Sequence, residues 1–353
     1  AEGDIEINHT GGTLTTERAG LEGSGGSASP SSIRSTTGSI TIVSDGELRL
    51  GKGGGDAGEA FVKADATNAQ VSLTADTITD VSNAAPIDVS SGGQLVLKGT
   101  TQVAGTTNGL EVSGRGIVLD LSAGTANEGG VNIIGNSEYL KVLANRSNVN
   151  VVETVNTGAN QLRISDVAGK DELRLDPLGI ATVHVVDSAD IALGPISVTD
   201  GQTLAIQAIN GSNITEGGTG PGNLDSAGNL LLTAEGSIGT PTESVLIPGG
   251  VGAAQAGSDA GDQLFIESRD VGLSLDTVTV TDALGNTQAT ASGLSAGGDI
   301  VAKVSGTNPA NLFQNGNIAS NSGSVILAVE SGNLEQTTGN TIKGASLGLK
   351  VSE

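Results

Sequence analysis

The chain has 353 residues and a formal net charge of −23, with 55 glycines, one tyrosine, three phenylalanines and no cysteine, methionine or tryptophan. This charge disfavours binding to nucleic acid and to anionic membrane surfaces, and the missing cysteine excludes a disulfide framework. With 36% hydrophobic but only 16% charged residues, the composition fits a narrow aliphatic core better than a disordered chain.

The beginning of the chain predicts short strands separated by a polar loop. Residues 1–19 alternate apolar and polar side chains around Ile5 and Leu14, and residues 20–37 are rich in Gly and Ser. From 39 to 208, alternating aliphatic stretches recur with little interruption between Gly- and Asp-rich corners. Longer segments interrupt the pattern elsewhere, and lateral insertions are predicted near 20–37, 216–223, 248–262 and 282–298.

A pair of inward-facing aliphatic residues opens each predicted long strand. Most steps between successive pairs are 21 to 24 residues, and the long steps of 26, 34 and 36 residues coincide with the predicted insertions. A self-similar period in this range is typical of repeat architectures. In chain order the pairs are Leu48/Leu50, Val71/Leu73, Leu95/Leu97, Ile117/Leu119, Leu140/Val142, Leu162/Ile164, Val183/Val185, Leu204/Ile206, Leu230/Leu232, Leu264/Ile266, Ile300/Ala302, Val325/Leu327 and Leu347/Leu349.

The last stretch, 324–352, shows the repeating unit most clearly. Alternating strands begin at Val325 and again at Leu347, 22 residues later, and turns at Gly332 and Gly339 lie between them. Since no segment has a helical period, the chain is predicted to be an all-β solenoid with coils of about 22 residues. We expect a single elongated domain over 1–353, and because the pattern opens and closes in mid-phase, a segment of a longer chain.

Three stretches resemble filamentous-haemagglutinin-type exoproteins, which are large bacterial surface proteins: 195–216, 228–240 (GNLLLTAEGSIGT) and 323–351. The resemblance covers most of the chain and implies a right-handed parallel β-helix, a secreted or cell-surface location, and a role in adhesion, biofilm or contact. It departs from the family at the Asn-Pro-Asn-Gly-type secretion motif, because the nearest match is Asn308-Pro309-Ala310-Asn311. The export route is therefore unsupported.

Few residues indicate catalysis or metal binding. Glu172, Arg174 and Asp176 share one strand face, and a solvated ion-pair face explains them better than a catalytic cluster. His9 and His184 are far apart, with His184 predicted to point outward, so neither a zinc nor a copper site is expected. No catalytic, cofactor-binding or metal-binding residue is predicted, although weak, non-specific Ca²⁺ binding is compatible with the acidity.

One row of outward-facing residues is predicted to contact a partner. The residue between each inward pair becomes apolar toward the C-terminus, where stacking would place four such side chains in one strip: Leu231, Phe265, Val301 and Ile326. The alternative is that the insertions 248–262 and 282–298 fold over this strip and bury it.

Together these patterns predict a non-catalytic, extracellular structural or adhesive rod. The expected partners are further coils of the same or a neighbouring chain and an unidentified host or cell-surface receptor, without nucleic-acid binding or membrane insertion. One alternative is a self-associating subunit of an extracellular fibre or biofilm matrix. Another is a polysaccharide-active β-helix enzyme, which would need clustered carboxylates on one lateral face.

Overall fold

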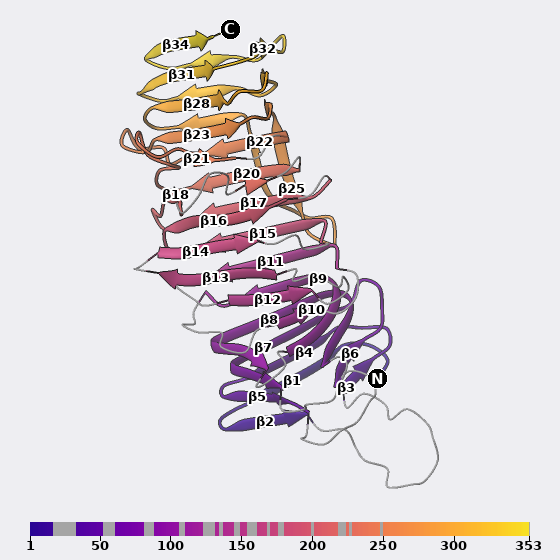
Figure 1. Cartoon of the computed structure of the whole chain (residues 1–353). Helices are drawn as coiled ribbons and strands as arrows, with labels where there is room; N and C mark the ends of the chain where they lie inside the picture. Colours follow the sequence, from indigo (N-terminus) through magenta and orange to yellow (C-terminus); the bar gives the residue numbers. More distant parts are fainter. Residues whose placement is uncertain are drawn as a thin grey trace, which may run out of the picture. The chain divides into compact units, whose positions relative to one another are not determined.

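The computed structural model is an all-β protein with large, mostly parallel sheets (Figure 1). It describes residues 1–16, 33–51, 61–80, 88–105, 110–122, 131–133, 137–144, 149–153, 161–167, 170–175, 180–198, 201–217, 224–225, 228–247 and 250–352. Within these ranges there is no helix, and so none that could span a membrane.

The chain forms two compact units, the first mainly from Ala1–Ile164 and the second mainly from Ala181–Thr281 and Asn286–Glu353. The strands that begin in the first unit are β1 (Ile5–His9), β2 (Thr13–Thr16), β3 (Ile33–Ser35), β4 (Ile40–Ser44), β5 (Glu47–Leu50), β6 (Val62–Ala64), β7 (Gln70–Asp80), β8 (Val89–Gly105), β9 (Leu110–Asp120), β10 (Val131–Ile133), β11 (Tyr139–Ala144), β12 (Val149–Glu153) and β13 (Gln161–Val167).

The strands of the second unit follow. They are β14 (Lys170–Leu175), β15 (Thr182–Asp187), β16 (Ile191–Ser197), β17 (Thr203–Ala208), β18 (Ile214–Glu216), β19 (Leu224–Asp225), β20 (Asn229–Ala234), β21 (Val245–Leu246), β22 (Gly250–Gln255), β23 (Leu264–Arg269), β24 (Leu273–Leu275), β25 (Thr277–Thr281), β26 (Thr287–Ser292), β27 (Leu294–Ala296), β28 (Ile300–Ser305), β29 (Leu312–Gln314), β30 (Ile318–Ser320), β31 (Ser324–Val329), β32 (Leu334–Gln336), β33 (Ile342–Lys343) and β34 (Ser346–Val351).

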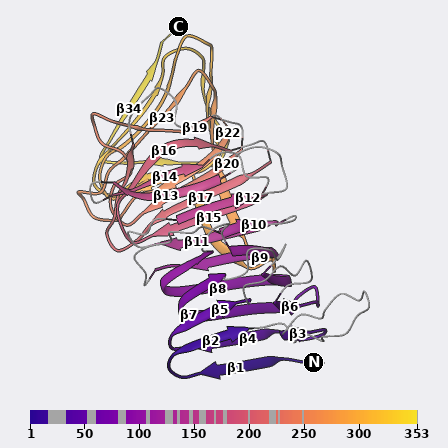
Figure 2. The ribbon, with the colours of Figure 1, turned by 60° about the horizontal axis from the view of Figure 1, so that its bottom comes forward.

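Parallel strands lie in register on successive layers of the first unit, as Figure 2 shows from β1 to β9. Their inward side chains form a column in which each aliphatic residue covers the one before, and all but the first are fully buried. This column is Ile5, Ile40, Val71, Leu95, Ile117 and Leu140. The predicted steps from Val71 to Leu140 are thereby confirmed.

Two predicted steps in this unit are wrong. Leu48 aligns with Leu14 and Ile78 in a second row (β2, β5 and the end of β7), not with Val71. The cause is that β4 and β5 are two consecutive strands of the same layer, paired with the beginning and the end of β7. Each of the two strands buries alternate residues. Leu162 does not continue the Leu140 column either: it pairs with Val151, because β12 and β13 are antiparallel. The short connection between these strands suits an antiparallel pair rather than a parallel crossover.

The second unit repeats the parallel register with one change of row. Val183, Leu204 and Leu230 align as predicted. The next predicted step, from Leu230 to Leu264, is wrong because Leu230 aligns with Gly252 in β22. The predicted insertion 248–262 therefore contains a strand of the stack, whose glycine and alanine residues carry too little hydrophobic signal to predict it.

The last layers form three rows. One row is β23, β28, β31 and β34, in which Leu264, Ile300, Val325 and Leu347 align as predicted. The other two rows are β24, β29 and β32, and β27, β30 and β33.

An antiparallel hairpin of β25 and β26 lies against β15, β20 and β22, and Figure 1 shows it running across those strands. Its Val278 and Val280 are buried, as are the outward-facing Leu231 and Ala253 beneath it. The predicted insertion 282–298 thus corresponds in part to this hairpin and in part to β27. Of the other predicted insertions, 20–32 and 218–223 lie outside the described residues, whereas β3 and the end of β18 are strands.

Ladders of side-chain hydrogen bonds link successive layers at the corners where β4, β7, β31 and β34 begin. In the first unit, Ser39 donates its backbone N–H to Asp4 Oδ1 (2.7 Å) and Gln70 donates to Ser39 Oγ (3.0 Å). In the second unit, the backbone N–H of Ser324 donates to Asp299 Oδ1 (2.7 Å). The hydroxyl of Ser346 donates to the hydroxyl oxygen of Ser324 (2.8 Å). The Asp and Ser residues at these corners therefore satisfy backbone donors of the next layer.

Some corner glycines are required by contact between layers. A Cβ on Gly46 would overlap the carbonyl oxygen of Gly12, and one on Gly323 would overlap the carbonyl carbon of Gly298. Neither Gly46 nor Gly323 has a positive φ, whereas Gly12 does. Close stacking of turns thus accounts for part of the high glycine content.

The ladder predicts a matched pair of variants. Asp299→Ala leaves the part-buried Ser324 N–H without its acceptor, and we expect the free energy of unfolding to fall by ~1–2 kcal/mol. Asp299→Asn keeps the Oδ1 acceptor and should lose less than half of that. Urea denaturation measures both values, and an alanine variant as stable as the parent chain would show that the ladder contributes nothing.

Candidate functional site

The predicted strip is divided between two rows of the second unit. Phe265, Val301 and Ile326 are adjacent in β23, β28 and β31, whereas Leu231 aligns with Ala253 in β22. Leu231 is fully buried beneath the hairpin, and Phe265 is 7% exposed, with Gly239 packed against it. Ile326 is 43% exposed because its neighbour in the next layer, Gly348, has no side chain to cover it.

The residues considered for catalysis do not form a reactive cluster. Arg174 pairs with Glu172 (2.8 Å) and is 55% exposed, and Asp176 lies outside the described residues. His184 aligns with Ala205 and the outward-facing Leu231, but it is 1% exposed because β25 lies against β15. Its Nε2 is 2.6 Å from Gln207 Oε1. His9 Nδ1 is 3.2 Å from Ser44 Oγ.

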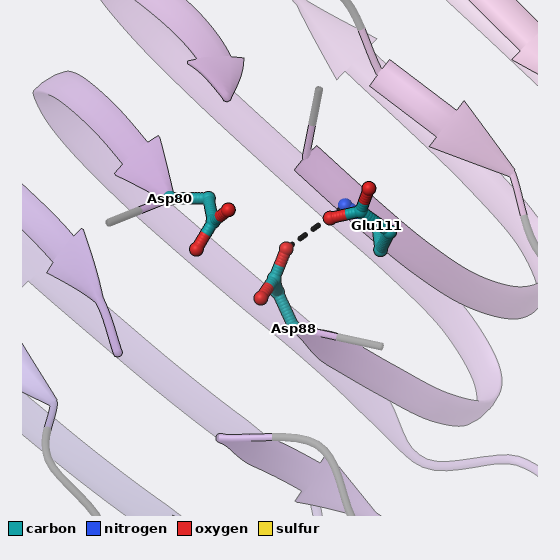
Figure 3. Close-up of side chains that lie close together, drawn as sticks. All are labelled: Asp80, Asp88 and Glu111. Atoms are coloured by element: carbon teal, nitrogen blue, oxygen red, sulfur yellow. Dashed lines mark hydrogen bonds between the residues drawn. The ribbon is translucent and has the colours of Figure 1, made fainter. Parts of the chain in front are cut away.

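Sequence analysis missed a cluster of three carboxylates in the first unit, Asp80, Asp88 and Glu111, drawn in Figure 3. One oxygen from each lies within 4.8 Å of the others. Asp80 ends β7, Asp88 immediately precedes β8, and Glu111 lies in the neighbouring β9. Backbone pairing sets the distance between the last two, because Asp88 N–H donates to Glu111 O (2.7 Å) and Glu111 N–H donates to Asp88 Oδ2 (2.9 Å).

Burial governs the protonation of this cluster. Asp80 is 2% exposed and Asp88 is fully buried. Burial, followed by the charge of Asp80, raises the pKa of Asp88 to about 9, against the effect of the Glu111 backbone N–H. Three carboxylates this close share a proton or hold a hard cation such as Ca²⁺. The one-layer spacing of 23 residues between Asp88 and Glu111 is the signal that could have revealed the cluster.

The second unit contains a related pair. Asp171 and Asp187 are both buried, and Asp187 Oδ1 accepts the backbone N–H of Ala189 (2.9 Å). Burial and the adjacent Asp171 carboxyl raise the pKa of Asp187 to about 8. Both groups of acids therefore lie within the walls of the stacked strands rather than on an open face.

A polar hollow of about 280 Å³ lies on the second unit, lined by Asp190, Asn213, Thr215, Ser237, Thr240 and Gln263 among others. Its one carboxylate, Asp190, accepts hydrogen bonds from the backbone N–H (2.8 Å) and Nδ2 (3.1 Å) of Asn213 through the same oxygen. The hollow has no second carboxylate for acid–base catalysis and no aromatic side chain for stacking a sugar ring.

Comparison of the chain with protein-family models finds no match, and comparisons with curated proteins and with solved structures find none. The resemblance to filamentous-haemagglutinin-type exoproteins therefore stays a prediction.

The carboxylate cluster predicts how stability depends on pH. An unfolded aspartic acid titrates near pH 4, whereas Asp88 keeps its proton to about pH 9 in the folded chain. Between these values the folded state binds the extra proton, so the free energy of unfolding falls as pH rises, by at most ~1.4 kcal/mol per pH unit. We expect Asp88→Asn, measured by urea denaturation in EDTA from pH 5 to 9, to reduce this fall.

Asp187→Asn provides a comparison for that experiment, because it should remove a separate part of the same fall in the second unit. If Asp88→Asn has the same pH profile as the parent chain, Asp88 does not retain a proton.

The exposures of Phe265 and Ile326 predict losses of stability of very different size at these two positions of the strip. Phe265→Ser removes a buried ring and should lower the free energy of unfolding by ~3–5 kcal/mol. Ile326→Ser replaces a half-exposed side chain and should change it by less than ~1 kcal/mol. Thermal and urea unfolding test both variants, and a large loss on Ile326→Ser would contradict the exposure assigned to it.

Proposed function

We propose that the chain is a non-catalytic structural and adhesive segment of an extracellular bacterial surface protein, with right-handed parallel β-helices as its scaffold. The observation that carries the proposal is the repeated parallel register of buried aliphatic columns with polar side chains outward. Parallel crossover connections are right-handed in nearly all proteins, which favours this hand. Layers of constant register suit a scaffold that presents an extended lateral surface.

The chemistry of the described residues also favours a scaffold over a polysaccharide-active enzyme. Of the clustered carboxylates, Asp80, Asp88, Asp171 and Asp187 are buried and Glu111 alone is half-exposed, which leaves a sugar chain little access to a pair of acids. The polar hollow offers a single carboxylate. The net charge of −23 keeps such a surface soluble and repels phosphate-rich partners.

An adhesion assay tests the proposal directly. Beads coated with the folded chain should attach to host cells or to biofilm matrix more strongly than beads coated with an acidic protein of similar charge. Attachment equal to this control on every surface would refute the adhesive role.

A parallel assay measures release of reducing or unsaturated ends from neutral and acidic polysaccharides, with and without Ca²⁺. We expect no release above background, because four of the five clustered acids are buried. Turnover that is lost in Asp88→Asn or Glu111→Gln would instead favour the enzyme.

A further inference from the structure

A tight turn between β17 and β18 contains an Asn-Gly dipeptide in a left-handed conformation. The φ angles of Asn210 and Gly211 are 60° and 76°. A hydrogen bond from the Ser212 N–H to the carbonyl oxygen of Ile209 closes the turn (3.3 Å). Asparagine followed by glycine is a favoured pair in such turns, because both residues tolerate a positive φ. Both Asn210 and Gly211 are exposed to solvent.

The surroundings of Asn210 do not hold its side chain. Its amide makes no hydrogen bond with any residue that the structure describes. A Cβ added to Gly211 would meet no atom within 4 Å, so the turn also has open space beside the glycine. The amide of Asn210 is therefore free to rotate toward the backbone nitrogen that follows it.

The backbone N–H of Gly211 points at a carboxylate of the neighbouring layer. It donates to Oε2 of Glu235 (2.9 Å), the residue that directly follows β20, and β20 pairs with β17. The side chain of Glu235 is itself exposed. A carboxylate in this position can take the proton when the nitrogen becomes a nucleophile.

We propose that Asn210 is a site of spontaneous deamidation, with Gly211 N as the attacking atom and the Glu235 carboxylate as the base. The bond between Gly211 N and Asn210 Cγ forms, and the bond between Asn210 Cγ and Nδ2 breaks. The proton of the Gly211 N–H passes to Glu235 and from there to the leaving nitrogen, which departs as ammonia. Water then opens the cyclic imide to give aspartate or isoaspartate, and is the only co-reactant.

A second Asn-Gly dipeptide, Asn315-Gly316, lies in a different environment. Asn315 Nδ2 donates to Ser274 Oγ (2.8 Å), and Asn315 Oδ1 accepts a hydrogen bond from the Thr337 hydroxyl. Gly316 is buried, and a Cβ added to it would lie 2.7 Å from Gly293 N. The Asn315 amide is thus fixed at both of its polar atoms, with no room to turn onto Gly316 N. We expect this dipeptide to keep its amide.

Either product at position 210 changes the surface of the second unit. Aspartate adds a negative charge beside Glu235, and isoaspartate also inserts a methylene group into the main chain of the turn. The contacts that tie the turn to the preceding layer remain: Ile209 N–H donates to Asp187 O (2.8 Å), and Ser212 Oγ donates to Ser188 O (3.0 Å). The reaction therefore alters the charge and shape of the surface and leaves the stack folded.

Incubation of the folded 353-residue chain in neutral buffer, followed by peptide mapping with mass spectrometry, tests the proposal. We expect Asn210 to convert at least about tenfold faster than Asn315, because two hydrogen bonds must break before the Asn315 amide can rotate. In denaturant the two dipeptides lose their surroundings and should convert at rates within about threefold of each other. Asn108-Gly109 lies outside the described residues and is measured on a separate peptide.

Glu235→Gln tests the base. The variant keeps an oxygen that accepts the Gly211 N–H but cannot take its proton, and because position 235 is exposed, thermal unfolding should not change. In the folded chain we expect conversion of Asn210 to slow by about tenfold, less than the ~100-fold of a positioned enzymatic base, because Glu235 is exposed to water. In denaturant the variant should convert like the parent chain. Glu335→Gln, at another exposed glutamate, is the matched control and should have no effect.

Three results would each overturn the proposal: equal conversion of Asn210 and Asn315 in the folded chain, an Asn210 amide that survives in the folded chain while the denatured chain converts, or a Glu235→Gln variant that converts as fast as the parent. The inference goes beyond the structural and adhesive role and does not depend on it. A chain that adheres and never converts refutes this inference alone, whereas a chain that converts and does not adhere refutes the adhesive role alone.

Discussion

The structure depends on parallel pairing in register between successive layers. This pairing places each inward aliphatic side chain directly on its equivalent one layer away, so Val71, Leu95 and Ile117 are each covered on both sides and fully buried. Burial of one such side chain is worth ~1.5–3 kcal/mol. A core of this kind needs neither aromatic residues nor disulfides, which explains a composition with neither cysteine nor tryptophan.

The same constraint decides where polar residues are tolerated. At the corners, Asp, Asn and Ser side chains accept backbone N–H groups of the next layer, as Asn213 Oδ1 does for Ser237 (2.8 Å). Inside the walls, layer spacing brings carboxyl groups together, and burial then keeps protons on Asp88 and Asp187 near neutral pH. Both of these acids are buried within the stacked strands.

The functional interpretation follows from this division between wall and surface. Outward side chains carry the negative charge and form ion pairs across layers, such as Arg115–Glu138 (2.8 Å). Among the described residues, the large aliphatic side chains that remain exposed are Ile209, Val271, Leu284, Ile326, Leu347, Leu349 and Val351. The structural and adhesive role proposed above rests on these outward polar surfaces.

The sequence by itself determined that the chain is all-β and which residues of each strand face inward, because side-chain direction alternates along a strand and burial selects one set. It also determined the layer spacing at Val325 and Leu347, where apolar residues are large and turns are short. Only the tertiary structure decided which stretch covers which. Leu48 lies under Ile78, Leu162 pairs antiparallel with Val151, and β22 forms a layer from glycine and alanine. The tertiary structure likewise brought Asp80, Asp88 and Glu111 together and covered Leu231 with a hairpin. The sequence could not predict either contact, because apolar–polar alternation indicates the direction in which a side chain points and not which side chain it meets.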